Sequence, residues 1–347
     1  YKGRFVKYPF ENGLGELDLD DTYECLIHYI QDRHPEPTNF KEWIYSTFGQ
    51  GIADAYLVPY NEKIWKIDLN DVMLDWAGGR VPRPPVEDVV KSALGISTEG
   101  YTHQLYFYYP KEGGFQALTD SLAAKVKGKT SIRTGFPVRS VRRDGDEWVV
   151  SNGSEERRYD QIVVSMPVQE FLRGLDSVPT EVQAAANGLR YNASLFVFLG
   201  LNECMAKEQT SVYFPQPDLI FHRVVFPHSF DDRCAPAGKY AAVAEISCPG
   251  EGGAWSMTDA EAVARVTDDL VREGFIKPED VITSHVTRTQ YSYVVYDMAY
   301  TQNITTVRDF AANRGFHLLG RFAEFEYWNT DQCFESALKL AAKLNGK

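Results

Sequence analysis

Residues 315–347 read GFHLLGRFAEFEYWNTDQCFESALKLAAKLNGK, and this stretch decides how the fold is interpreted. A short apolar run ends at Gly320-Arg321, and an aromatic segment then leads to NTDQ and a helical pattern. A strand that ends in glycine lets a ligand approach the backbone closely, and free N–H groups at a helix N-terminus favour an anion such as a pyrophosphate. The stretch therefore predicts either an anion-binding strand–helix unit or an ordinary helix with Asp331 as its N-cap. The spacing alone leaves both interpretations open.

The pattern changes twice upstream of this stretch. Mostly helical periodicity gives way to a mixture of short strands with one amphipathic helix, and then to β-rich runs separated by turn residues, which is typical of an antiparallel sheet. Because the terminal strand and helix would pack against the middle piece, we expect an α/β fold with α+β elements and one discontinuous domain. The predicted domains are a helical domain at 16–96, a discontinuous α/β domain at 97–170 and 301–347, and an antiparallel-sheet domain at 1–15 and 171–300.

Several local signals make element-level predictions. The segment KGRFVKYP at 2–9 alternates like a short strand, as does TSIRTG at 130–135. Asp20 or Asp21 is expected to cap the first helix, and Thr38-Asn39 is expected to cap the helix that begins FKEWIYSTFG. These signals can each be compared directly with the structure.

Composition limits the classes of function. A net charge of −12 without a basic run disfavours partners such as nucleic acid or an anionic membrane surface. No run of about 18 apolar residues is present, so no membrane span is expected. No signal peptide is visible, and we therefore expect a cytoplasmic protein. The five cysteines include no C-x-x-C, the seven histidines show no metal-ligand spacing, and no G-x-S-x-G occurs, so neither a metal site nor a covalent nucleophile is predicted.

No complete dinucleotide-binding fingerprint occurs in the chain. Three glycine-rich fragments are GLGELD at 13–18, GQGIAD at 49–54 and GEGGAW at 250–255, and none of them is G-x-G-x-x-G. None lies between an apolar strand and a helix, which is where such a loop would be expected. Turns or helix breaks explain all three.

An ordered set of segments resembles the UDP-galactopyranose mutase family, within the larger group of FAD-dependent amine oxidases and protoporphyrinogen oxidases. The segments occur in the order of the family along nearly the whole chain. They are GRFVKYPFENGL at 3–14, NFKEWIYSTFGQGIADAYLVPYNEKIW at 39–65, YPKEGGFQAL at 109–118, YFPQPDLIFHR at 213–223, YSYVVYDMAY at 291–300 and GRFAEFEYWNTDQ at 320–332. Each segment alone is weak evidence, whereas the ordered set is specific for the flavoprotein group.

The resemblance implies a flavoprotein with an FAD-binding domain, incomplete here, a helical domain and a sheet that shares the substrate site. It implies a flavin-dependent isomerase that interconverts the pyranose and furanose forms of a nucleotide sugar for cell-surface glycans. The chemistry would be carried by flavin N5, so no catalytic side chain is assigned. A small-molecule substrate is the expected partner, and a homo-oligomer is possible.

The resemblance also carries over binding residues. Asn39 and Trp43 match positions near the uridine, while Tyr213, Arg223 and Tyr293 match positions that hold the diphosphate. An arginine fork suits a phosphate, although a core tryptophan and a salt-bridged sheet arginine are open alternatives. We expect His222 to point to the other face of its strand from Arg223. The matching cofactor-binding positions are Gly113, Gly114, Val138, Gly320, Arg321, Asn329, Asp331 and Gln332, with Val138 as a backbone contact to adenine.

Three departures weaken the match. The βαβ unit with the G-x-G-x-x-G loop is not in this sequence, so we expect the chain by itself to bind FAD poorly or not at all. Val58 stands where several mutases have a second phosphate-binding arginine. Without that arginine the substrate loses a charge-assisted hydrogen bond that contributes about 1.5–3 kcal/mol to binding, and Arg80 or Arg288 would have to compensate. Glu11 stands where glutamine is common, and its carboxylate would repel a diphosphate unless it were protonated or paired.

Three hypotheses follow from these observations. The first is a flavin-dependent nucleotide-sugar mutase. The second is an FAD-dependent oxidoreductase of the amine oxidase group, which would oxidise its substrate on the same scaffold. The third is a non-catalytic fragment or remnant that binds a ligand or partner.

Overall fold

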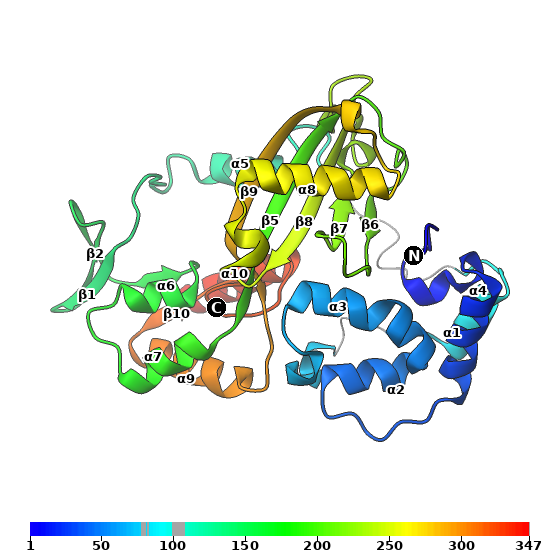
Figure 1. Ribbon diagram of the computed structural model, residues 1–347. Helices are drawn as coiled ribbons and strands as arrows, with labels where there is room; N and C mark the ends of the chain where they lie inside the picture. The colour runs from blue at the N-terminus through cyan, green and yellow to red at the C-terminus, as the bar shows by residue number, and fades with distance from the viewer. Residues whose placement is uncertain (78–80, 82, 99–107, 347) are drawn as a thin grey trace. The chain divides into compact units, whose positions relative to one another are not determined.

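The computed structural model describes residues 1–77, 81, 83–98 and 108–346 (Figure 1). The chain forms two compact units, and each is built from two separate segments. Unit 1 comprises Tyr1–Lys127 and Ala193–Gln290, and unit 2 comprises Gly128–Asn192 and Tyr291–Lys347. A discontinuous arrangement was expected, and the predicted division into three domains stays a prediction.

The first segment of unit 1 is helical. Asn39 is the N-cap of α2, and its Oδ1 accepts a hydrogen bond of 2.9 Å from the backbone N–H of Glu42. This confirms the predicted cap. One π-helical turn, Ala53–Leu57, joins α2 to the next helix. The α-helices of this segment are α1 (Leu19–Gln31), α2 (Phe40–Ile52), α3 (Val58–Trp65), α4 (Val86–Ala93) and α5 (Gln116–Val126).

Gly49 explains how closely α1 and α2 approach each other. Its φ is +71°, a conformation that side chains rarely adopt, and a Cβ at this position would lie 2.6 Å from the carbonyl carbon of His28. Only glycine satisfies both conditions without a shift of the backbone. The GQG fragment at 49–51 is therefore a packing feature of two helices and not a nucleotide-binding loop.

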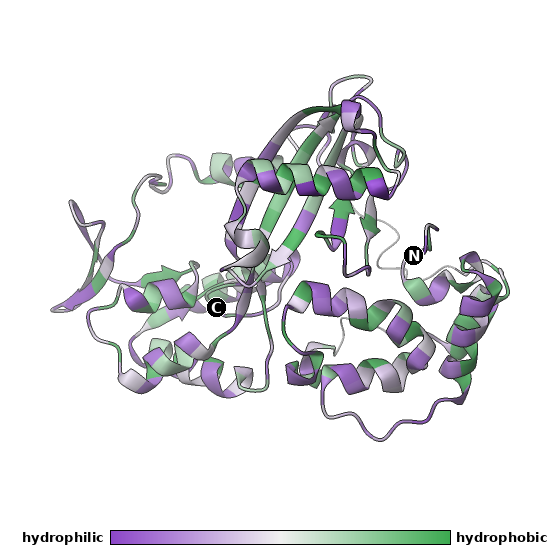
Figure 2. Ribbon diagram, viewed as in Figure 1, coloured by the Kyte–Doolittle hydropathy of each residue, from purple (hydrophilic) through white to green (hydrophobic). Residues whose placement is uncertain are grey.

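The second segment of unit 1 forms most of a five-stranded sheet in the order β6-β7-β8-β5-β9, in which the first residues of β5 and the last residues of β9 belong to unit 2. Helix α8 (Asp259–Arg272) lies across one face of this sheet, as Figure 1 shows, and buries Ala262, Val266 and Leu270 against it. Strands β5 and β8 are largely hydrophobic in Figure 2. The strands are β5 (Tyr191–Leu201), β6 (Ser211–Tyr213), β7 (Arg223–Val225), β8 (Tyr240–Cys248) and β9 (Val281–Val294).

The register of this sheet places polar residues in one row. Tyr213 pairs with Arg223, Arg223 pairs with Glu245, and Glu245 pairs with Phe196, in antiparallel ladders. Side chains of directly paired residues lie on the same face of a sheet. The row is therefore on the face opposite the apolar core under α8, which contains the alternate residues Val224 and Ala244.

Unit 2 contains an antiparallel sheet, a parallel strand pair and four helices. The predicted terminal strand is present as β10 (Phe316–Leu318), which pairs in parallel with β4 (Ile162–Val164). Trp148 packs on Phe316 with ring centroids 4.3 Å apart. The remaining elements are β1 (Ser140–Asp144), β2 (Glu147–Ser151), β3 (Glu156–Tyr159), α6 (Val168–Arg173), α7 (Thr180–Gly188), α9 (Tyr300–Asn313) and α10 (Thr330–Leu344).

Some local predictions were wrong. Residues 2–9 form turns and irregular backbone instead of a strand, and two short 3-10 turns follow them. Residues 131–135 are also irregular. The N-cap of α1 is Asp18 rather than Asp20 or Asp21, and the N-cap of α10 is Asn329 rather than Asp331. The segment YTHQLYFYYPKEGG at 101–114 has the pattern of a strand followed by a loop, and its residues 101–107 lie outside the described residues.

Candidate functional site

Tyr213 and Arg223 face each other at the ends of β6 and β7. The tyrosine ring stacks on Tyr8, with centroids 4.9 Å apart and planes 21° apart, and it meets the edge of Tyr60 at 5.6 Å. Tyr213 therefore stands in an aromatic cluster, and its strand partner carries a guanidinium group. This combination suits a ligand with both a planar ring and an anionic group.

A buried carboxylate holds Arg223. Its Nε donates to Oε2 of Glu245 over 2.9 Å, and its terminal Nη2 donates to the same oxygen. Glu245 is only 3% exposed, whereas the Arg223 side chain is 33% exposed. The guanidinium group is therefore fixed from the buried side, and its positive charge is balanced there by the carboxylate.

His222 lies beside the same carboxylate. Its Nε2 is 3.9 Å from Oε2 of Glu245, so the expectation that it points away from Arg223 to the other face is wrong. The reason is that regular pairing begins only at Arg223, so strict alternation does not extend to His222. Burial lowers the pKa of His222 to about 3, although the charge of Glu245 opposes this shift. The imidazole is thus neutral, and neither ring nitrogen has a hydrogen-bond partner within the described part of the chain.

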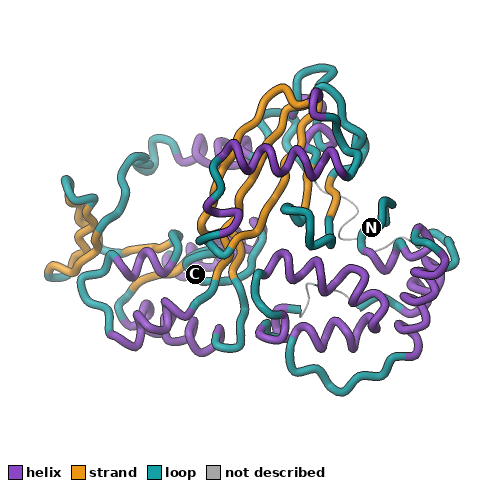
Figure 3. The backbone as a smooth tube through the Cα atoms, in the orientation of Figure 1, coloured by secondary structure: helices purple, strands orange, loops and turns teal. Residues whose placement is uncertain are grey.

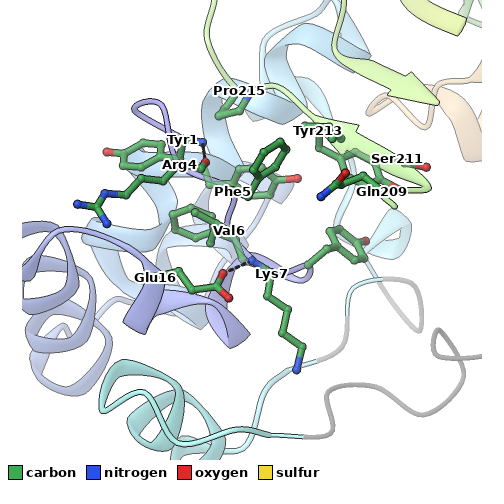
Figure 4. A pocket seen from close by; sticks show the side chains of 14 residues that line it. Tyr1, Arg4, Phe5, Val6, Lys7, Glu16, Gln209, Ser211, Tyr213 and Pro215 are labelled. Carbon is green, nitrogen blue, oxygen red and sulfur yellow. Dashed lines mark hydrogen bonds between the residues drawn. The ribbon is translucent and has the colours of Figure 1, made fainter. Parts of the chain in front are cut away.

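A cavity of about 300 Å³ lies beside Tyr213 (Figure 4). Figure 4 shows Gln209, Ser211 and Tyr213 on one side of it and the N-terminal segment on the other. Tyr8 and Tyr56 also line the cavity. We call this space the aromatic cavity.

Tyr56 is the most deeply buried tyrosine of the aromatic cavity. Burial raises its pKa well above the usual value, and nearby Tyr8, Tyr213 and Glu11 raise it further. Its ring stacks on Phe10 at 4.9 Å. The ring is therefore held rigidly as part of the cavity wall and stays protonated at all ordinary pH values.

Asn39 and Trp43 lie elsewhere in unit 1. Asn39 is engaged as the cap of α2, and Trp43 is only 8% exposed, between Phe40 at 6.0 Å and Phe48 at 5.8 Å. Neither residue lines the aromatic cavity. Their assignment to a uridine site stays a prediction, and their observed contacts are those of a helix cap and a core aromatic.

Unit 2 brings Tyr293 and Arg321 together. The guanidinium group of Arg321 lies 4.7 Å from the ring centroid of Tyr327 and 5.7 Å from that of Tyr293. It donates hydrogen bonds to the carbonyl oxygens of Trp328 and Ser292, and its Nε is buried without a partner among the described residues. Tyr293 and Tyr327 stack at 6.0 Å.

Most of the predicted cofactor-binding residues gather at the start of α10. A shallow cavity of about 600 Å³ there is lined by Arg321, Asn329 and Asp331, among others. Gln332 accepts a hydrogen bond from the backbone N–H of Asn329 over 3.0 Å. Gly320 has a φ of +82°, and a Cβ there would meet no atom within 4 Å, so the backbone faces open space. The unpartnered Nε of Arg321 and this open glycine fit an anionic group such as the pyrophosphate of FAD.

Gly320 and Gln332 do not line this cavity, although they lie near its lining residues in the sequence, and the other three predicted cofactor residues lie elsewhere. Gly113 and Gly114 have φ values of +79° and +60° in unit 1, in the turn before α5. Val138 is 39% exposed in unit 2, in the segment before β1. All three stay predictions.

The structure shows the surroundings of three of the four residues at which the sequence departs from the mutase pattern or would have to compensate for the departure. Val58 is buried as the first residue of α3, so it presents no charge. Arg288 bonds Asp259 at 2.5 Å and the carbonyl oxygen of Met257 at 2.6 Å, so it is already engaged. Glu11 is buried in a 3-10 turn. Arg80 lies outside the described residues.

Sequence reasoning missed the partners that hold the site. Glu245 is a lone acid in the apolar strand KYAAVAEISC, and a buried acid at such a position is a signal for a paired cation. Tyr8 and Tyr56 have no distinguishing pattern, because their contacts with Tyr213 depend on tertiary structure.

Comparison with known proteins gives the family. Residues 62–345 match the family described as flavin containing amine oxidoreductase. The chain belongs to that family. Family membership confirms the suspected group, supports an enzyme that uses a flavin, and implies FAD as the cofactor.

Solved structures share the fold. A crystal structure of reduced UDP-galactopyranose mutase has a TM-score of 0.89 at 22% identity, over 99% of this chain and 75% of that chain. A putative protoporphyrinogen oxidase from Exiguobacterium sp. 255-15 gives 0.68 at 14% identity, over 94% and 71%. Wild-type putrescine oxidase bound to putrescine gives 0.57 at 14% identity, over 99% and 77%. At these identities the likeness establishes the mixed α/β fold alone.

The described residues were also compared with the requirements of a membrane-spanning helix and of a metal site. Within the described residues, no helix combines the length and apolar character that crossing a bilayer requires. The same residues contain no group of three or more His, Cys, Asp or Glu side chains arranged to bind a metal ion.

Proposed function

We propose that this chain is part of a flavin-dependent enzyme that acts on a nucleotide sugar and interconverts its pyranose and furanose forms. The observation that carries the proposal is the register that pairs Arg223 with Tyr213. Tyr213 lines the aromatic cavity, and Arg223 is its strand partner and does not itself line the cavity. A nucleotide sugar has the two features that this arrangement suits, a planar base and an anionic diphosphate. The high TM-score to UDP-galactopyranose mutase supports the proposal at the level of the fold.

The protein groups have separate roles in this proposal. Arg223 binds the diphosphate, with Glu245 fixing the direction of the guanidinium group. Tyr213 and Tyr8 provide ring surfaces for the base or sugar. The resemblance also implies a diphosphate contact for Tyr293, which lies in unit 2, and this role stays a prediction. These groups bind and orient the substrate and exclude water, which is the usual contribution of a protein to cofactor chemistry.

FAD is the implied cofactor, and the residues at the start of α10 would hold its pyrophosphate. Arg321 supplies the charge, Gly320 allows close approach, and Asn329, Asp331 and Gln332 begin the helix whose N-terminus faces the anion. When bound in reduced form, the flavin supplies the nucleophilic nitrogen that the sugar chemistry needs. A cytoplasmic location goes with the proposal, since the protein would act on a nucleotide sugar.

Turnover under reducing conditions tests the proposal. The protein is supplied with FAD, reduced with dithionite and incubated with UDP-galactofuranose, and the product is followed by chromatography. Formation of UDP-galactopyranose is expected from the full-length wild-type protein that contains this chain, and it is expected to fall about tenfold or more in Arg223→Lys, because lysine cannot form the planar fork. Absence of product together with absence of UDP binding would remove the proposal.

One observation favours a second candidate, an FAD-dependent oxidoreductase of the amine oxidase group. Glu245 balances the positive charge of Arg223, and Val58 contributes no charge. The residues around Arg223 therefore carry less positive charge than a site with two unpaired arginines for a diphosphate. The distinguishing result is reduction of the flavin by a substrate without added reductant. The mutase proposal predicts no such reduction by UDP-galactose.

A further inference from the structure

Lys63 on α3 occupies an unusual position for a lysine. It is only 7% exposed, and its Nζ donates three hydrogen bonds to main-chain carbonyl oxygens, with lengths of 2.9 Å to Phe214, 2.7 Å to Gln216 and 2.6 Å to Phe221. An ammonium ion has three N–H donors and no acceptor. The three carbonyl oxygens therefore match its full donor capacity.

All three carbonyl oxygens belong to one connection. Residues 214–222 join β6 to β7 without forming a helix or a strand of their own (Figure 3). We call this segment the β6–β7 connection. It begins directly after Tyr213 and ends directly before Arg223, so its path determines how the two residues approach each other.

The opposite side of the β6–β7 connection is held by α8. The backbone N–H of Ile220 donates to Oδ2 of Asp269 over 2.8 Å, and Arg265 donates to the carbonyl oxygen of Asp218 over 2.6 Å. Lys63, on α3 of the helical segment, holds the same connection through its three hydrogen bonds. The two ends of the connection are also held by backbone hydrogen bonds, from the N–H of Phe214 to the carbonyl oxygen of His222 over 2.8 Å and from the N–H of His222 to that of Glu245 over 3.1 Å. The side-chain contacts therefore hold the residues between these ends.

We propose that Lys63 is the positioning residue of the candidate substrate site, because its ammonium ion fixes the β6–β7 connection and thereby the spacing of Tyr213 and Arg223. The proposal rests on the proposed function for what the site binds. The positioning role itself rests on the three hydrogen bonds alone.

Lysine is suited to this role by the geometry of its donors. The three oxygens converge on a single nitrogen, whereas the guanidinium group of arginine is planar and spreads its donors over a fork. Methionine has nearly the same length and shape but no donor, so it would leave three buried carbonyl oxygens without this partner.

Several charged groups surround Lys63. Burial is the main cause that lowers its pKa to about 7, the Lys66 ammonium lowers it further, and Asp218, Asp269 and Glu273 raise it. Raising the pH through this range removes a proton from the buried nitrogen. The site is thus linked to proton binding through a residue that does not touch the substrate.

Hydrogen exchange and UDP titration together test the proposal. The variants are Lys63→Met, Lys63→Arg and the control Lys91→Met, which removes a lysine from the exposed surface of α4, where it pairs with Glu87. In Lys63→Met we expect amides of the β6–β7 connection to exchange at least about tenfold faster, and UDP to bind about tenfold more weakly, since a charge-assisted hydrogen bond contributes this much. The KM should rise and kcat should change little. Lys91→Met should match the wild type in every readout.

Lys63→Arg keeps the charge and tests the geometry. It is expected to fold and still to weaken UDP binding, by about threefold or more, because its planar fork cannot reach all three oxygens. If Lys63→Met does not fold, the test depends on Lys63→Arg. The proposal is then overturned if Lys63→Arg has the same amide exchange rates and the same UDP affinity as the wild type. If Lys63→Met folds, unchanged exchange in residues 214–222 would overturn it.

The two proposals fail in different ways. A wild-type chain that neither binds UDP nor turns over UDP-galactofuranose contradicts the proposed function, while the exchange rates still decide whether Lys63 holds the connection. Wild-type binding of UDP with the same affinity in Lys63→Met contradicts the positioning role alone.

Discussion

Glu245 shows how one buried carboxylate determines the character of the residues around it. It lies in an otherwise apolar strand, receives two hydrogen bonds from Arg223 and has His222 beside it. A buried charge is tolerated only when it is paired. Arg223 therefore has a structural role in the sheet as well as its proposed role in binding.

Removal of Arg223 is expected to destabilise unit 1. Arg223→Ala leaves Glu245 without its guanidinium partner, and we expect the free energy of unfolding to fall by about 2–4 kcal/mol, somewhat less than for a fully buried pair because Arg223 is partly exposed. Urea denaturation measures the loss. Arg223→Ala with Glu245→Gln is expected to recover most of it, since the unpaired charge is gone. Equal loss in the single and double variants would contradict the role given to Glu245.

Lys63 is expected to make stability depend on pH in a defined window. Its pKa is lowered from 10.5 to about 7 by burial first and Lys66 second, so the unfolded chain binds more protons than the folded chain between these values. Unfolding then becomes harder as the pH rises through this window. Relative to Lys63→Met, the wild-type free energy of unfolding should rise by about 2 kcal/mol from about pH 7 to about pH 9. Parallel pH profiles for the two proteins would show that the pKa is not lowered.

Individual residues differed in how far sequence could place them. The resemblance named Tyr213 and Arg223, and the structure pairs them in one register. Glu245 was missed because it is 22 residues from Arg223, and only the register of β7 with β8 brings the two together. Non-local pairs of this kind leave almost no local signal.

Among the elements, α2 shows a cap that sequence predicts directly. Asn39 is in extended conformation and accepts the N–H of Glu42, as an N-cap should. The same residue matches a uridine-side position in the mutase family. The two roles can be separated by substitution.

Asn39→Ala is expected to lower the free energy of unfolding by about 1 kcal/mol through loss of the cap, and Asn39→Ser, which can also cap, by much less. Both stabilities can be measured by thermal and urea denaturation. If the cap is the main role of Asn39, UDP affinity stays unchanged in both variants. Loss of affinity in Asn39→Ser with full stability would instead support the uridine-side role.

Errors at the level of elements have physical reasons. The segment 2–9 resembles a short strand in sequence, but no strand among the described residues pairs with it, and a local pattern alone cannot supply a partner. The start of α10 was placed two residues late because Asp331 is a common cap. The true cap, Asn329, is followed three residues later by Gln332, whose side chain bonds back to it. This is a capping-box pattern, and it was visible in NTDQ.

The described residues combine a five-stranded sheet with a three-stranded antiparallel sheet, β1-β2-β3, and a two-stranded parallel pair, β10-β4, the last two of which lie in unit 2. Patterns in the sequence predict the antiparallel sheet and the terminal strand and helix, whereas the parallel pairing of that strand with β4 comes from the structure. The chain also spans only 75% of the length of the mutase whose fold it shares.

The affinity for FAD depends on the whole molecule. The sequence contains no G-x-G-x-x-G loop, and the residues at the start of α10 supply only part of a pyrophosphate site. We expect this chain to bind FAD weakly, and Arg321→Gln to bind it more weakly still by about tenfold, since a charge-assisted contact is lost. Fluorescence quenching of FAD on titration measures both. Equal affinity in the two proteins would exclude Arg321 from the cofactor site.

The most direct test of the central claim is a comparative calorimetric titration with UDP and with uridine. The claim is that the aromatic cavity and Arg223 together bind a nucleotide diphosphate. We expect the wild-type chain to bind UDP saturably and to bind uridine more weakly. In Arg223→Gln we expect the affinities for UDP and uridine to become equal. No saturable UDP binding, or an equal preference for UDP in the wild type and in Arg223→Gln, would contradict the claim.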